Sequence, residues 1–87
     1  MYKRQSERIR LDAVWWEAGL AVELDGRQAH ATTRAFDADR RRDRRVAVQL
    51  GLQVVRVTWR HLATEPDAIE SDLKALYTRG VAARAAA

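Results

Sequence analysis

Residues 8–25, RIRLDAVWWEAGLAVELD, decide the fold because they predict an antiparallel hairpin. Apolar and polar side chains alternate over 8–15 and again over 20–25, a pattern that is typical of half-buried strands. The four residues between them, Trp16 to Gly19, have the length of a hairpin loop and end in a glycine. The stretch therefore predicts two neighbouring antiparallel strands.

The chain that follows predicts a strand, a helix and a strand in parallel arrangement. Helical periodicity runs from about Thr33 to Leu50, and Gly51 is suited to end that helix. Residues 52–58, LQVVRVT, are β-branched and apolar enough for a buried strand, and Pro66 opens a last helix. The expected fold is α/β with the order β-β-α-β-α, a hairpin followed by a parallel βαβ unit.

The two ends differ in character from the middle. Residues 1–5, MYKRQ, resemble the translated end of a sequencing-library adapter, so we expect them to be a non-native scar. Residues 81–87 are mostly alanine without an apolar period, and we expect a disordered tail there. The domain is expected to occupy residues 6–80.

Composition narrows the class of protein. With 87 residues, 47% of them hydrophobic and 32% charged, the chain allows one folded domain. It has no cysteine, which excludes disulfides and thiolate zinc sites, and no apolar run near the ~20 residues of a membrane span. We expect a soluble, cytoplasmic protein. The net charge of +4, with six arginines between Arg34 and Arg45, suits an acidic partner such as nucleic acid.

The hairpin carries the first candidate site. If the loop is four residues long, paired positions sum to 35, so Asp12 lies opposite Glu23 and Asp25 shares the face of Glu23. Cross-strand carboxylates with Cβ atoms ~5 Å apart repel each other unless a cation joins them, and Mg²⁺ or Mn²⁺ takes such oxygen ligands. Spacing alone leaves open the alternative of a solvated acidic face.

The arginine-rich helix expected at 33–50 carries the second candidate site. Its expected core stripe consists of Phe36, Val46, Ala47 and Leu50. Asp39 and Asp43 fall in the same stripe at i and i+4, a like-charge pair that needs a cation, for which Arg40 is the nearest candidate in sequence. We expect these two aspartates to hold arginines in place. Three further arginines point away from the stripe and are expected either to be solvated or to contact phosphates: Arg41, Arg44 and Arg45.

His30 follows the acidic strand and could act as a general acid or base near neutral pH. The alternative is a structural or exposed histidine. Trp15, Trp16 and Trp59 are expected to pack in the core or the hairpin rather than to stack on bases.

Together these segments resemble a known family. They are RLDAVWWEAGLAVELDG at 10–26, His30, FDADRRRDRR at 36–45 and LGLQVVRVTWRHL at 50–62. This ordered set looks like the very-short-patch-repair-like branch of the PD-(D/E)XK nucleases. The resemblance covers roughly residues 8–79.

The resemblance implies a restriction-endonuclease-like core truncated at its N-terminus, without the first helix and first strand. A winged-helix domain often precedes such cores, and one is expected upstream. It also implies a DNA endonuclease in which Asp12 and Glu23 hold Mg²⁺ or Mn²⁺, and in which Asp25 or His30 accepts a proton from water. The family's usual lysine is replaced by Asp25. Two alternatives stay open: a nuclease-like domain that binds nucleic acid without cutting it, and a protein-interaction module.

Overall fold

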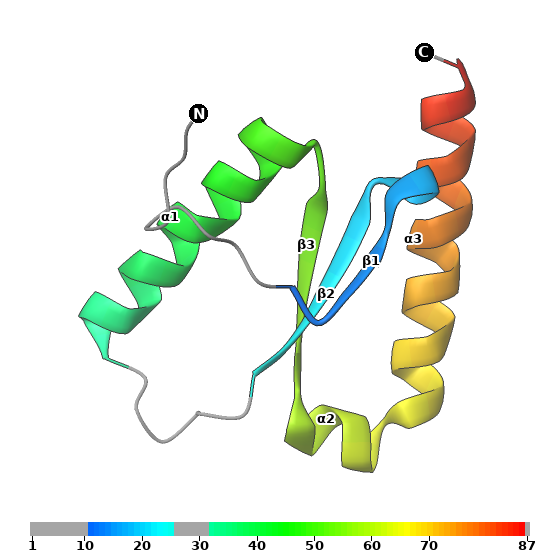
Figure 1. Ribbon diagram of the computed structural model, residues 1–87. Coiled ribbons are helices and arrows are strands. Elements are labelled where there is room, and N and C mark those ends of the chain that lie inside the picture. The colour runs from blue at the N-terminus through cyan, green and yellow to red at the C-terminus, as the bar shows by residue number, and fades with distance from the viewer. Residues whose placement is uncertain (1–10, 26–31, 87) are drawn as a thin grey trace.

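The computed structural model of the chain describes residues 11–25 and 32–86. It is a small mixed α/β domain with one three-stranded sheet and three α-helices in the described part (Figure 1). The elements, in chain order, are β1 (Ala13–Trp15), the 3-10 turn η2 (Trp16–Ala18), β2 (Leu20–Asp25), α1 (Thr33–Leu50), β3 (Gln53–Thr58), α2 (Trp59–Thr64) and α3 (Pro66–Ala86).

The hairpin has the predicted register. β1 and β2 are antiparallel, and Trp15 pairs with Leu20, Val14 with Ala21 and Ala13 with Val22, so every pair sums to 35. The loop is η2 plus Gly19, whose positive φ of 60° favours glycine. Its four-residue length is therefore confirmed.

β1 is shorter than the sequence predicts. It begins at Ala13, because the Asp12 side chain, through Oδ2, accepts the backbone N–H of Leu24 at 2.7 Å. In a longer ladder with this register, that N–H would face Leu11. A short polar side chain has taken the place of a backbone carbonyl, and regular pairing stops there.

β2 is the central strand. Its other edge pairs in parallel with β3, from Leu20 opposite Gln53 to Asp25 opposite Thr58. The connection is α1, so β2, α1 and β3 form the predicted parallel βαβ unit. The same register sets Glu23 beside Arg56.

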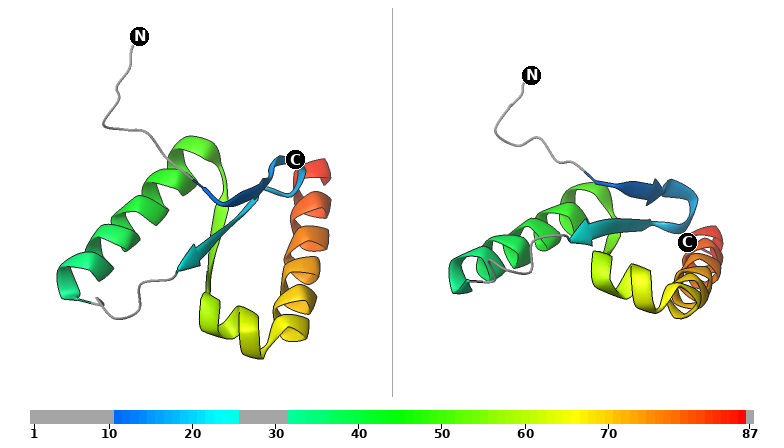
Figure 2. Two further views of the ribbon diagram at one scale, coloured as in Figure 1. Left: turned by 60° about the horizontal axis from the view of Figure 1, so that its bottom comes forward. Right: turned by 90° about the horizontal axis from the view of Figure 1, so that it is seen from below.

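The sheet lies between two helices, α1 on one face and α3 on the other (Figure 2). On the α1 face, Ala21, Val46 and Leu52 form the buried core. Because side chains alternate along β2, Glu23 and Asp25 lie on the same face as Ala21 and are directed toward α1.

α1 has the predicted bounds. The Thr32 side chain accepts the N–H of Ala35 at its start, and Gly51 ends it with a φ of 69°. The predicted stripe is wrong in two places, since Phe36 is 58% exposed and Ala47 is also exposed. The sheet ends short of Phe36, and the inner face of α1 is instead polar around Asp39 and Asp43.

The C-terminal third also differs from the prediction. The short helix α2 was not expected, and residues 81–86, expected to be a disordered tail, continue α3. Two contacts hold this end: Arg84 donates to the carbonyl of Gly51 at 3.3 Å, and Gly80 lies against the Ala18 carbonyl. None of the helices in the described part has the length and apolar character needed to cross a membrane.

Candidate functional site

The hairpin brings Asp12 beside β2, the strand that bears Glu23. Asp12 directly precedes β1, and its carboxylate is fixed on β2 by the N–H of Leu24, the residue that follows Glu23. Within residues 11–25 and 32–86, Asp12 makes no other hydrogen bond or ion pair, so Oδ1 has no partner there. The Asp12 carboxylate, which precedes β1, is thus oriented by β2 and still has one oxygen available among the described groups.

Glu23 is ion-paired with two arginines. Arg42 of α1 binds its Oε2, and Nη1 of Arg56 on β3 lies 3.5 Å from its Oε1. The Glu23 side chain is 13% exposed. A carboxylate buried to that degree needs compensation of its charge, and the two guanidiniums supply it.

Arg56 is held by carboxylates from two elements. It donates to both oxygens of Asp43, Nη2 to Oδ1 at 2.9 Å and Nε to Oδ2 at 3.3 Å, and its Nη1 lies 3.8 Å from Asp39. Burial by itself would lower the pKa of Arg56. The hydrogen bond and charge of Asp43, with the charges of Asp39 and Glu23, outweigh burial and leave that pKa raised. Arg56 is therefore a permanent cation and cannot serve as a base.

We call these five residues the arginine–carboxylate cluster: Glu23, Asp39, Arg42, Asp43 and Arg56. It joins β2, α1 and β3. Asp39 and Asp43, which the sequence analysis expected to hold arginines, both contact Arg56. Arg40, the neighbour suggested by sequence, lies 3.7 Å from Asp43 and above the ring of Phe36 at 4.8 Å, where it is half exposed.

Two more residues were predicted for the site, Asp25 and His30. Asp25 ends β2 beside Thr58, on the face of Glu23, and is half-buried. It takes part in an interaction and is therefore not a free carboxylate. His30 lies outside the described residues.

A divalent cation requires oxygen or nitrogen donors that converge on one point. Among residues 11–25 and 32–86, no three His, Asp or Glu side chains are arranged to hold a metal ion. Mg²⁺, however, keeps several waters and is commonly held by only one or two carboxylates. Asp12 and Glu23 offer oxygen donors of the kind that Mg²⁺ takes, and Glu23 is already paired with two arginines.

The outer face of α1 is basic. Arg41, Arg44 and Arg45 are exposed, as their predicted orientation requires, and together with Val48 and Gln49 they line a shallow hollow of about 360 Å³. A row of guanidiniums of this kind suits contact with phosphates along a nucleic-acid backbone.

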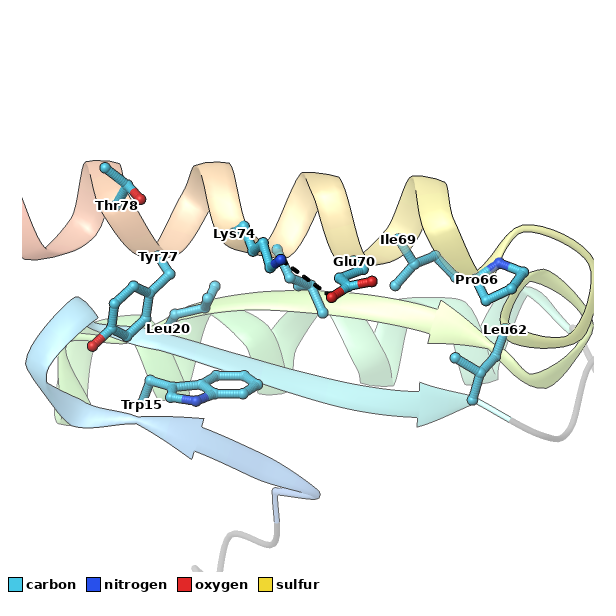
Figure 3. Close-up of a pocket in the computed structure, with 10 residues that line it drawn as sticks. Trp15, Leu20, Leu62, Pro66, Ile69, Glu70, Lys74, Tyr77 and Thr78 are labelled. Carbon is cyan, nitrogen blue, oxygen red and sulfur yellow. Dashed lines mark ion pairs between the residues drawn. The ribbon is translucent and has the colours of Figure 1, made fainter.

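A larger hollow lies elsewhere. About 630 Å³ in volume, it separates the other face of the sheet from α3, with Trp15 and Leu20 on one wall and Ile69 and Tyr77 on the other (Figure 3). Its lining is mainly apolar, and its two charged residues, Glu70 and Lys74, pair with each other at 3.2 Å. Alternation along the hairpin places it on the face opposite Glu23, so it is separate from the acidic site.

The tryptophans only partly follow the prediction. Trp15 is half-buried against the α3 hollow, but Trp16 and Trp59 are each more than half exposed. Both exposed tryptophans stand where a strand passes into a turn or helix, at the ends of β1 and β3.

Sequence reasoning missed Arg42 and Arg56. Signals for both were present: Arg42 is three residues after Asp39 and four before Val46, which puts it on the inner face of α1. Arg56 is the one charged residue in the apolar stretch 52–58 and alternates in phase with Val54. A charge in such a strand indicates a partner on the covering helix.

No family model, curated protein or solved structure matches this chain.

Proposed function

We propose that this chain is a divalent-cation-dependent endonuclease domain of restriction-endonuclease-like type that hydrolyses phosphodiester bonds of DNA. The observation that carries the proposal is the hairpin register, which brings Asp12 beside the end of β2 that bears Glu23, a carboxylate bound by the arginine-rich helix. Acidic ligands for a cation and basic ligands for phosphate thereby share one side of the sheet.

Each residue has a role in this proposal. Asp12 and Glu23 would hold Mg²⁺ or Mn²⁺, which would supply an activated water and compensate charge on the phosphate. The N–H of Leu24 orients Asp12, and Arg56, fixed by Asp43, orients Glu23. Asp25 or His30 would accept the proton of the attacking water.

Binding is assigned to the outer face of α1. Arg41, Arg44 and Arg45 would contact backbone phosphates on either side of the cut, and such contacts carry no sequence information. These three arginines would therefore contribute to DNA affinity and not to sequence specificity.

A second candidate is a domain that binds nucleic acid without cutting it. It is favoured by the pairing of Glu23 with Arg42 and Arg56, which balances the carboxylate without a metal ion. In this case the arginine–carboxylate cluster would only stabilise the fold, and α1 would do the binding.

One experiment separates the two candidates. The 87-residue chain is incubated with supercoiled plasmid in Mg²⁺ or Mn²⁺, with EDTA as the blank, beside Glu23→Gln and Asp12→Asn. A nuclease converts the plasmid to nicked or linear forms, and both variants lose that activity while still shifting DNA in a gel. Binding without cleavage by the unsubstituted chain supports the second candidate. Cleavage that survives both substitutions contradicts the proposed site.

A further inference from the structure

β3 forms one edge of the sheet. Among the described residues, β2 is the one strand that pairs with it, from Gln53 to Thr58 and without a bulge (Figure 1). The N–H of Gln53 donates to the carbonyl of Gly19, so every second residue from Gln53 onward directs its backbone groups toward β2. The N–H and C=O groups of Val54 and Arg56 therefore point away from β2, toward the outer edge.

This edge has few of the features that prevent strands from pairing. Edge strands are commonly protected by lysine, proline or a bulge. β3 has the sequence QVVRVT, which contains no lysine or proline, and its register is regular. Its one charged residue, Arg56, is balanced by the three carboxylates of the arginine–carboxylate cluster, so this charge does not oppose a further strand. β3 is therefore suited to accept a strand at its outer edge.

The side of α1 that lies toward β3 exposes apolar side chains. Asp43 contacts Arg56 of β3, which identifies that side of the helix. Phe36 is seven residues before Asp43 and Ala47 is four residues after it, so both share this side. Both are exposed, Phe36 by 58%. A strand added to β3 would extend the sheet beneath this side of α1.

The opposite face of β3 is also partly open. A hollow of about 190 Å³ lies between β3 and the helices α2 and α3, and its lining includes Val55, Val57, Ile69 and Leu73. Val55, near the middle of β3, is half-buried. Apolar surface thus borders the outer edge of β3 on both faces of the sheet.

We propose that two copies of this chain pair through β3 in antiparallel orientation, so that their two three-stranded sheets join into one continuous sheet with a two-fold axis. The proposal does not depend on the proposed nuclease function. A second copy fits this edge because the same strand serves both chains and the assembly closes. Pairing of β3 with β1 of another copy would instead leave free edges, and β1 offers only Ala13–Trp15.

The register of this pair follows from the geometry of β3. The two-fold axis is perpendicular to the sheet, so opposed residues must share a face, and residues with outward backbone groups must meet. Two such registers use most of β3, one centred on Val55 and one on Arg56. The second would oppose two arginines, which is unfavourable. The first pairs residues 53–57 with the same residues of the second copy and sets Val54 opposite Arg56.

The first test is sedimentation of the 87-residue chain at about 10 μM to 1 mM, a range in which a modest interface associates. We expect the mass to rise toward twice the 9.9 kDa of one chain. Val55→Lys should raise the dissociation constant of the dimer roughly tenfold, because two like charges would be opposed across the axis. Val48→Lys is the matched control, since Val48 is 84% exposed on α1, and its dissociation constant should stay within about twofold of that of the unsubstituted chain.

The second test reports the register directly. The chain has no cysteine, so Val55→Cys introduces a single thiol. Residues opposed in a pair that lacks hydrogen bonds have Cα atoms about 4.5 Å apart, a separation that suits a disulfide. Under mild oxidation, Val55→Cys should form covalent dimers on a non-reducing gel several-fold faster than Val48→Cys.

Each outcome bears on the proposal. A chain that stays monomeric over this concentration range refutes the dimer. If the chain dimerises but Val55→Lys dissociates no more readily than Val48→Lys, or Val55→Cys cross-links no faster than Val48→Cys, another surface joins the copies and the β3 pairing is overturned. If circular dichroism shows that Val55→Lys is unfolded, the cross-linking rates decide.

Discussion

Replacing Arg56 by methionine should destabilise the domain strongly, because it removes the cation that three carboxylates share. Glu23, Asp39 and Asp43 would then face one another across β2, α1 and β3. Removing one partner of a fully buried pair costs about 3–5 kcal/mol, whereas exposed pairs contribute about 1 kcal/mol or less. Arg56 is 18% exposed and Asp39 is 38% exposed, so solvent screens part of the repulsion. We therefore expect a loss of about 2 kcal/mol.

The assay is urea denaturation and thermal melting followed by circular dichroism. For a domain of this size, about 2 kcal/mol corresponds to a fall in Tm of roughly 8–16 °C. Arg60→Met, an exposed arginine on α2, is the control and should stay within about 0.5 kcal/mol of the unsubstituted chain. A double-mutant cycle with Asp43→Asn should show coupling, because the two residues are in direct contact. If Arg56→Met costs no more than Arg60→Met, the cluster does not organise the site as argued.

Three more outcomes are expected. Gly80→Ala should destabilise the protein by about 1–3 kcal/mol in urea, because the added Cβ would overlap the carbonyl of Ala18. At a helical glycine with open space around it, the same substitution stabilises by about 1 kcal/mol. A variant more stable than the unsubstituted chain would contradict this packing. The hydrogen bond to Glu17 raises the pKa of Tyr77 above its ordinary 10.0, so the folded state holds the phenol proton more tightly than the unfolded state does. The stability of the protein should therefore fall as pH rises above that value. Tyr77→Phe should flatten this part of the stability–pH curve, and an unchanged slope would show that Tyr77 does not cause the pH dependence. Arg44→Glu should weaken DNA binding and lower the slope of log affinity against log salt by about one, and a slope equal to that of the unsubstituted chain would remove Arg44 from the phosphate contacts.

Local patterns predicted most of the backbone. The hairpin register follows from one loop length, and the bounds of α1 follow from Thr32 and Gly51, signals that act over a few residues. The sequence did not predict that the Asp12 side chain would end β1, because this depends on competition between a side chain and a backbone carbonyl for one N–H. The exposure of Phe36 depends likewise on how far the sheet extends beneath α1.

The candidate site was predicted in part. Alternation and register placed the acids, and helical spacing placed Asp39 and Asp43 on the inner face of α1. Which arginine they would meet depends on the parallel pairing of β2 with β3, a contact between distant segments that sequence periodicity does not encode. Arg56 could therefore be identified only once the strands were set side by side.

The central position of β2 has a consequence for the order of folding. One edge of β2 pairs with β1, from which it is separated by a four-residue loop. The other edge of β2 pairs with β3, and the whole of α1 lies between these two strands in the chain. Hairpins form within about 1–10 μs, and pairing of distant segments is slower because a larger loop must close first. Asp12 and Glu23 thus approach each other before Arg56 arrives, and folding should pass its barrier as the arginine pairs with Glu23. Substitutions in β3 should then alter the folding rate more than substitutions near the end of α3 do.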